Sequence, residues 1–177
     1  TCINSYLTAG ELAYIVGNSE SQLLVTSIVK LPVAREALAS CPRVRLCLVV
    51  DGGDTVRALD DPRFADFAEA TAAYPDTPIA DEWLGTPMLY SSGTTGRPKG
   101  ILRPLPENPP SEPLPLFHFL DKLWQCEEGM RYLSPAPLYH SAPQANVALA
   151  IRNGGTVVIM EHFDPEQYLQ LVQQHRI

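Results

Sequence analysis

Two nearly continuous apolar runs, separated by a helical pattern, constrain the fold of this chain most strongly. Residues 23–25 read LLV and residues 44–50 read VRLCLVV. Apolar side chains at successive positions predict strands that are buried on both faces, as in a parallel sheet covered by helices. Between the two runs, residues 33–40 (VAREALAS) predict a crossover helix. The chain therefore begins with a strand, helix and strand unit.

The same alternation continues along the chain. Thr8 and Glu11 form a capping box that predicts the start of a first helix, and Asp61-Pro62 predicts the start of another. We expect strands at residues 88–90 and 156–160. A last helix should be capped by Asp164, with a buried stripe at Tyr168, Leu171, Val172 and His175. This order predicts an α/β fold in three layers, with a mostly parallel sheet flanked by helices.

A proline-rich segment interrupts the pattern. Six of the thirteen residues from 103 to 115 (RPLPENPPSEPLP) are proline, which lacks an N–H donor and has a fixed φ angle. This segment cannot form a helix interior or a central strand. An extended surface loop is the expected structure, and a proline-rich ligand for a partner domain is the alternative.

Composition excludes several classes of function. The chain has 13 Lys and Arg against 20 Asp and Glu, a net charge of −7, which opposes general nucleic-acid binding. The four cysteines lack a zinc-binding spacing, and no apolar stretch approaches the roughly 18 residues of a membrane span. We expect a globular protein in a reducing, cytoplasmic setting.

The segment MLYSSGTTGRPKGI, residues 88–101, has the composition of a phosphate-binding loop. It combines hydroxyls, glycines and two cations. Glycine allows backbone N–H groups to approach a ligand closely, hydroxyls donate hydrogen bonds and lysine neutralises charge. Between Trp83 and Pro106 the charged residues are Arg97, Lys99 and Arg103, a local charge of +3. A solvated loop without a ligand is the alternative.

This segment differs from the P-loop signature G-x-x-x-x-G-K-[ST]. Counting from Gly93, Pro98 takes the place of the second glycine and Gly100 that of the metal-binding Ser or Thr. Pro104 and Pro106 also exclude a long helix after the loop. We therefore expect a different phosphate loop, connecting two strands at residues 88–90 and 100–103.

Residues 90–100 (YSSGTTGRPKG) resemble, at every position, the phosphate-binding signature of the adenylate-forming superfamily. Residues 3–12, with Ile3-Asn4 and LTAGEL, are similar to the segment before the family's second strand-helix unit. Residues 133–140 (LSPAPLYH) resemble its next motif, at the acyl pocket. The first forty residues are most similar to the acyl-CoA synthetases, which favours a fatty or related organic acid as substrate.

The resemblance implies an acyl-CoA synthetase that uses ATP, Mg²⁺ and coenzyme A. A carboxylic acid and ATP would give an acyl-adenylate and pyrophosphate, and coenzyme A would then take the acyl group. The implied phosphate-binding residues are Ser91, Ser92, Gly93, Thr94, Thr95, Gly96, Lys99 and Gly100, with Thr95 a candidate for Mg²⁺ through the phosphates. His140 and Tyr139 are the candidates for the acyl pocket or its gate. Arg97 occupies a variable position and should face solvent.

The resemblance covers residues 1–177 as a partial N-terminal AMP-binding domain. We expect a first α/β sub-sheet over about 1–128 and the start of a second over about 129–177. The expected fragment of a longer ligase would itself be inactive and would expose apolar surface that favours self-association. The alternative is a self-contained, non-catalytic domain that binds a nucleotide or a partner.

Overall fold

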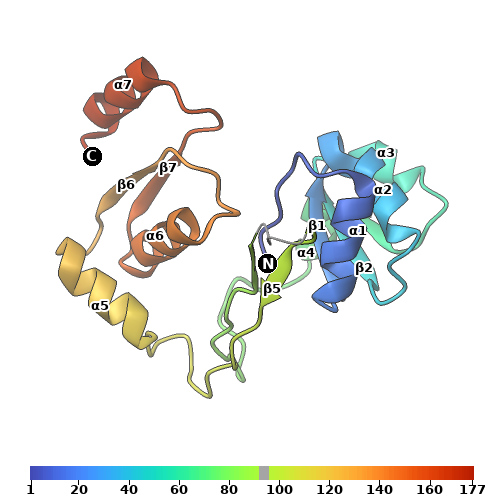
Figure 1. The fold of residues 1–177 in the computed structure, drawn as a ribbon, viewed down its shortest axis with the longest axis horizontal. Helices are drawn as coiled ribbons and strands as arrows, with labels where there is room; N and C mark the ends of the chain where they lie inside the picture. The colour runs from blue at the N-terminus through green and yellow to red at the C-terminus, as the bar shows by residue number, and fades with distance from the viewer. Residues whose placement is uncertain (92–95) are drawn as a thin grey trace. The chain divides into compact units, whose positions relative to one another are not determined.

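The computed structural model describes residues 1–91 and 96–177, which form two compact units. The N-terminal unit consists of residues 3–81 and 90–101. The C-terminal unit consists of residues 1–2, 82–89 and 102–177. Figure 1 shows both as mixtures of helices and strands, and each is described by itself.

A three-stranded parallel sheet forms the centre of the N-terminal unit. Its strands are β1 (Leu23–Ser27), β2 (Leu46–Val50) and β3 (Phe64–Asp66), in the order β1-β2-β3. Leu23 is in register with Leu46, and Cys47 with Phe64. This arrangement confirms the parallel α/β fold that the two apolar runs predict. The predicted burial on both faces is wrong, because Leu23, Val25, Leu46 and Val50 are exposed on one face of the sheet. Parallel neighbours require crossover connections, and helices provide them here.

Helices α1 (Ala9–Asn18) and α2 (Leu31–Leu38) contribute most of the helical core, and the 3-10 turn η1 (Ile28–Lys30) leads into α2. The predicted capping box is present, since the Thr8 hydroxyl accepts from the Glu11 N–H and the Glu11 carboxylate accepts from the Thr8 N–H. The predicted crossover helix is α2, which begins two residues earlier than expected because Pro32 fits the first turn. The buried core consists of Val16, Leu31, Leu38, Cys41, Val44, Cys47, Val49, Val56 and Phe64.

One prediction in this unit was wrong. No helix begins at Asp61-Pro62; residues 64–66 form β3, and the short helix α4 (Phe67–Thr71) begins after Asp66. Asp61 instead pairs with Arg63, at 2.8 Å between Oδ2 and Nη2. Pairing of Phe64 with Cys47 completes the sheet edge and buries the Phe64 ring, a tertiary contact that the local helix signal does not report.

Asp66 joins three elements at the end of β3. Its carboxylate accepts from the N–H of Gly53, the first residue of α3 (Gly53–Arg57), at 2.8 Å. It also accepts from the Glu69 N–H at 3.1 Å and so caps α4. These backbone hydrogen bonds lower the pKa of Asp66, that of Gly53 foremost, because they stabilise the charged form.

We expect Asp66→Asn to lower the urea midpoint of unfolding at neutral pH, because an amide offers one acceptor where the carboxylate offers two. The lowered pKa means that the carboxylate's contribution is present above the unfolded-state value of about 3.9 and is lost as pH falls through the folded value. The difference between wild type and variant should therefore shrink in acid. Asp54→Asn is the control, since Asp54 is exposed and pairs with Arg57 on the surface. An equal effect of both variants, or no dependence on pH, would contradict this role.

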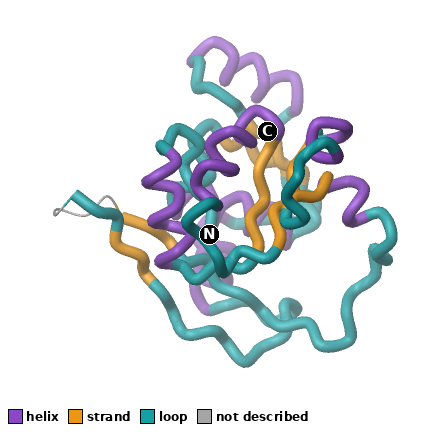
Figure 2. Tube along the Cα trace, turned by 90° about the vertical axis from the view of Figure 1, so that its right-hand side faces the viewer, coloured by secondary structure: helices purple, strands orange, loops and turns teal. Residues whose placement is uncertain are grey.

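Strands β4 (Leu89–Ser91) and β5 (Lys99–Ile101) pair with each other in a separate two-stranded sheet. The prediction that the glycine-rich loop connects two strands is confirmed, with the first strand one residue later than expected and the second shorter. Residues 102–114 contain neither helix nor strand, as expected for the proline-rich segment, which is part of the long loop in Figure 2.

The C-terminal unit is built on a second parallel pair. Its elements are α5 (Pro115–Trp124), β6 (Arg131–Ser134), α6 (Ser141–Arg152), β7 (Thr156–Ile159) and α7 (Pro165–His175). Strand β6 pairs with β7 from Arg131↔Thr156 to Ser134↔Ile159, and α6 is the crossover. Gly155 directly precedes β7, at a position where a Cβ would lie 2.5 Å from the Met130 carbonyl oxygen, so only glycine fits without a shift. Asp164 caps α7 as predicted, and the expected stripe on α7 faces inward but is only half-buried.

Candidate functional site

The glycine-rich loop connects the adjacent strands β4 and β5. Ser91 ends β4 and is exposed, and Lys99 begins β5 and is also exposed. Gly96 has φ +88°, a conformation that a side chain would strain, and Gly100 is half-buried. The predicted site residues Ser92, Gly93, Thr94 and Thr95 lie outside the described residues, so their roles stay predictions.

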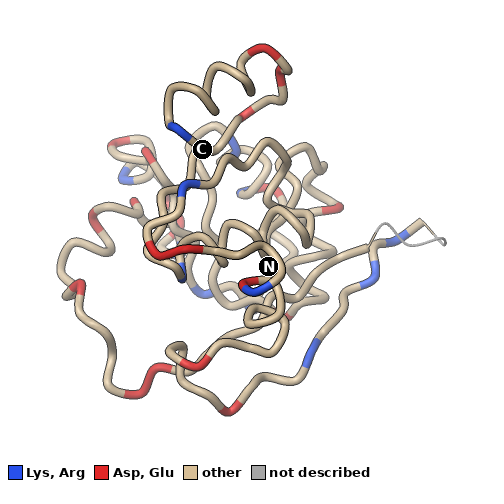
Figure 3. The backbone as a smooth tube through the Cα atoms, turned by 90° about the vertical axis from the view of Figure 1, so that its left-hand side faces the viewer, with Lys and Arg blue, Asp and Glu red and all other residues tan. Residues whose placement is uncertain are grey.

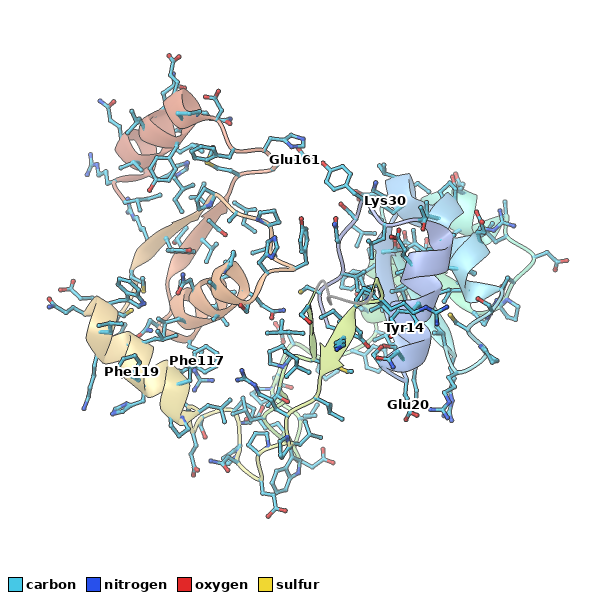
Figure 4. All side chains as sticks on the ribbon, viewed as in Figure 1. Tyr14, Glu20, Lys30, Phe117, Phe119 and Glu161 are labelled. Carbon is cyan, nitrogen blue, oxygen red and sulfur yellow. The ribbon has the colours of Figure 1, made fainter. Side chains whose placement is uncertain are left out.

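Helix α1 contacts both ends of this loop. The Tyr90 hydroxyl donates to Asn18 Oδ1 at 2.7 Å, and its oxygen also lies 3.4 Å from the Ile15 carbonyl oxygen. At the other end, the Tyr14 hydroxyl donates to the Pro98 carbonyl at 3.0 Å. Figure 4 labels Tyr14 on the side of α1 that faces β5. One rigid helix therefore fixes the residues that enter and leave the loop.

One further contact strengthens this attachment. The Arg97 guanidinium lies over the Tyr14 ring, with Cζ 5.4 Å from the centroid, a cation–π geometry. Burial raises the pKa of Tyr90, so its hydroxyl stays protonated at neutral pH and remains a donor. Sequence reasoning missed Tyr14 and Asn18, although their spacing of four residues places both on one face of a helix.

The charge at the loop is positive and unopposed. Arg97, Lys99 and Arg103 are exposed, and within residues 1–91 and 96–177 none of them forms a salt bridge. Figure 3 shows Lys and Arg but no Asp or Glu directly after the grey residues. Unpaired cations beside exposed main chain favour an anionic ligand.

Tyr139 and His140 lie in the C-terminal unit, at the start of α6. Their ring centroids are 4.5 Å apart with an interplanar angle of 45°. His140 is the N-cap residue of α6, and its ring makes no capping hydrogen bond. The His140 side chain is exposed and thus accessible to a ligand. Its role in an acyl pocket stays a prediction.

Ser134 ends β6, six residues before His140. It is fully buried, and its hydroxyl has no hydrogen-bond partner among the residues that the structure describes. The other histidines are exposed, at His118 and His162, or half-buried, at His175.

The described residues contain neither a metal-binding group of side chains nor a membrane-spanning helix. In the part of the chain outside 92–95, no group of three or more His, Cys, Asp or Glu side chains could hold a metal ion. Within that same part, no helix is both long enough and apolar enough to cross a membrane.

Comparison with known proteins gives consistent results along the whole chain. The model of a family described as AMP-binding enzyme matches residues 1–177. The medium-chain acyl-CoA ligase Mig of Mycobacterium avium is 26% identical, over 99% of this chain and 34% of its own length. Feruloyl-CoA synthase of an Amycolatopsis species is 29% identical, over 99% of this chain and 31% of its own length. The chain thus spans about a third of the curated relatives that it matches.

Solved structures confirm the fold. The apo structure of Mycobacterium smegmatis MbtA matches 97% of this chain and 31% of its own, with a TM-score of 0.70 and 27% identity. The O-succinylbenzoate coenzyme A synthetase of Bacillus subtilis, in complex with ATP and a magnesium ion, matches 99% of this chain and 32% of its own. That match has a TM-score of 0.65 and 20% identity.

Proposed function

This chain belongs to the AMP-binding enzyme family, and we infer its function from that membership. Its curated relatives include acyl-CoA ligases. We propose that the protein carrying these residues is an ATP-dependent carboxylic acid–CoA ligase. In the proposed reaction, a carboxylate oxygen attacks the α-phosphorus of ATP, giving an acyl-adenylate and releasing pyrophosphate. A thiol, that of coenzyme A, then displaces AMP and forms the thioester.

The observation that carries this proposal is the unpaired positive charge beside an anchored loop. Lys99 and Arg97 are exposed and without salt bridges in the described part of the chain, and Tyr14 holds the Pro98 carbonyl between them. A protein of net charge −7 would repel a polyphosphate elsewhere on its surface. The loop is a positively charged part of this acidic protein, as the binding of a nucleoside triphosphate requires.

The proposed roles follow from the chemistry of each group. Ser91, Gly96, Gly100 and residues 92–95 would donate hydrogen bonds to the phosphates, and Lys99 would neutralise their charge. Mg²⁺, with Thr95 as its candidate neighbour, would supply further charge neutralisation between phosphate oxygens. No general base is needed to prepare the nucleophile, because a carboxylic acid is already ionised at neutral pH. Positioning and charge stabilisation are then the main tasks of the protein.

The acyl group would bind near Tyr139 and His140, whose rings form one aromatic surface. The feruloyl-CoA synthase and the medium-chain acyl-CoA ligase among the relatives support an organic acid as substrate. We expect the 177 residues by themselves to be inactive in adenylation. The four cysteines are all free thiols, which supports our proposal of a cytoplasmic setting.

In the full-length protein that carries these residues, Lys99→Ala should lower kcat/KM for ATP about 10- to 100-fold in ATP–pyrophosphate exchange, since a charge-assisted hydrogen bond contributes about 1.5–3 kcal/mol. Lys99→Arg should restore part of the loss, because it keeps the charge. The matched control is Lys122→Ala, which removes an exposed lysine on α5. Absence of exchange with every tested aliphatic, aromatic and amino acid would contradict the ligase proposal. An unchanged Lys99→Ala variant would contradict the role of this lysine.

We also propose that copies of this chain associate through one face of the β1–β2 sheet. Leu23, Val25, Leu46 and Val50 share that face by strand register, and about half of the Val25 side chain is exposed, at 51%. Uncovered apolar surface of this kind favours association.

Sedimentation velocity should therefore show a species larger than the monomer, with a proportion that rises with concentration. Val25→Lys should reduce that species, because it places a charge on the apolar face. Val29→Lys is the control, as Val29 is a valine on η1 outside the sheet and is even more exposed than Val25. A wild-type chain that stays monomeric at all concentrations would contradict the association.

A further inference from the structure

Helix α1 has two faces that make contacts. One face packs in the core, and the other contacts the loop. Ile15 and Val16 are buried, and Val16 belongs to the core cluster of the N-terminal unit. Tyr14 and Asn18, one helical turn apart, form hydrogen bonds with the two ends of the loop instead. Helix packing therefore sets the positions of these two side chains before the loop meets a ligand.

Each contact fixes a different property of the loop. Tyr90 is held at the β4 end through its hydroxyl, which donates to the Asn18 amide oxygen at 2.7 Å. At the β5 end the Pro98 carbonyl is held directly, and this carbonyl belongs to the peptide unit that leads into Lys99. A carbonyl that is hydrogen-bonded cannot rotate freely, so its contact restricts the backbone from which the lysine extends.

The Tyr14 ring adds a third restraint. The Arg97 guanidinium lies over it at 5.4 Å, which keeps this cation on the side of the loop that faces α1. Arg97 and Lys99 flank Pro98 in sequence. One tyrosine thus positions the charge of Arg97 and the carbonyl that precedes Lys99.

We propose that Tyr14 and Asn18 are positioning residues, holding Tyr90 and Pro98 on α1 so that the cations of Arg97 and Lys99 are pre-organised for a polyphosphate. This inference rests on the proposed function, since it assigns a task to the same loop. Pre-organised groups lose less entropy on binding and stabilise developing charge without rearrangement. Neither residue touches the reacting atoms in this account.

The first test measures whether α1 anchors the loop, and it requires no enzymatic activity. Hydrogen–deuterium exchange of the 177-residue chain should be faster in peptides that cover residues 96–103 for Tyr14→Phe, and in peptides that cover residues 88–91 for Asn18→Ala. Tyr74→Phe is the matched control, because Tyr74 is an exposed tyrosine of the same unit and its hydroxyl has no hydrogen bond within the described residues. Exchange rates equal to those of the wild type in both variants would overturn the proposal. Faster exchange throughout α1 would also overturn it, because the residues would then support the helix and not the loop.

The second test uses the full-length protein that carries these residues and separates positioning from chemistry in ATP–pyrophosphate exchange. Tyr14→Phe and Asn18→Ala should each raise KM for ATP about 3- to 10-fold, the loss of one hydrogen bond, with a smaller change in kcat. Tyr14→Leu, which also removes the ring beneath Arg97, should raise KM further, and Arg97→Ala should add little to it. If the wild type shows no exchange with any acid, the ligase proposal fails while the hydrogen-exchange result still decides the anchoring. If the wild type is active and the variants match it in KM, the positioning role fails and the ligase proposal stands.

Discussion

The packing of α1 on the core of the N-terminal unit is the constraint on which the candidate site depends. Burial of Ile15 and Val16 fixes the rotation of the helix, and that rotation directs Tyr14 and Asn18 to the two ends of the glycine-rich loop. The core in turn requires the parallel pairing of β1 with β2, which buries Cys47 and Val49. The apolar packing of this core thereby fixes the positions of the two ends of the loop. A disturbance of this core should reach the site without changing any residue of the loop.

The distribution of charge indicates which class of ligand this geometry suits. The whole chain is acidic, yet Arg97 and Lys99 are exposed beside backbone that glycine keeps open. Isolated surface charges contribute little to stability when they lack an oppositely charged partner, and Arg97, Lys99 and Arg103 form no salt bridge within the described residues. They are available to a polyanionic ligand, and membership of the AMP-binding enzyme family supports our proposal that this ligand is a nucleotide. Contact of the Tyr139–His140 pair with the organic part of the substrate is likewise our proposal.

Sequence patterns predicted the parallel α/β organisation because continuous apolar runs and capping residues are local signals. Thr8 and Asp164 cap helices as predicted, and the run at 44–50 contains a strand of the parallel sheet. Its predicted burial on both faces is wrong, since Leu46 and Val50 are exposed. The helix predicted at Asp61-Pro62 failed because the pairing of Phe64 with Cys47 is non-local. The contacts of Tyr14 and Asn18 were missed for the same reason, since each partner lies more than seventy residues away. Local patterns identify the loop by its composition, but only the packed structure shows what holds it.

The most direct test of the central claim is a nuclear magnetic resonance titration of the isotope-labelled 177-residue chain with magnesium pyrophosphate. Chemical shift changes should concentrate in the backbone N–H groups of residues 91–101, with weaker changes at Tyr14 and Asn18. Rising salt concentration should weaken pyrophosphate binding, because the attraction is electrostatic. Inorganic sulfate at equal ionic strength should produce smaller changes at the same residues. No change at millimolar pyrophosphate, or changes centred on another part of the chain, would contradict the assignment of this loop as the phosphate site.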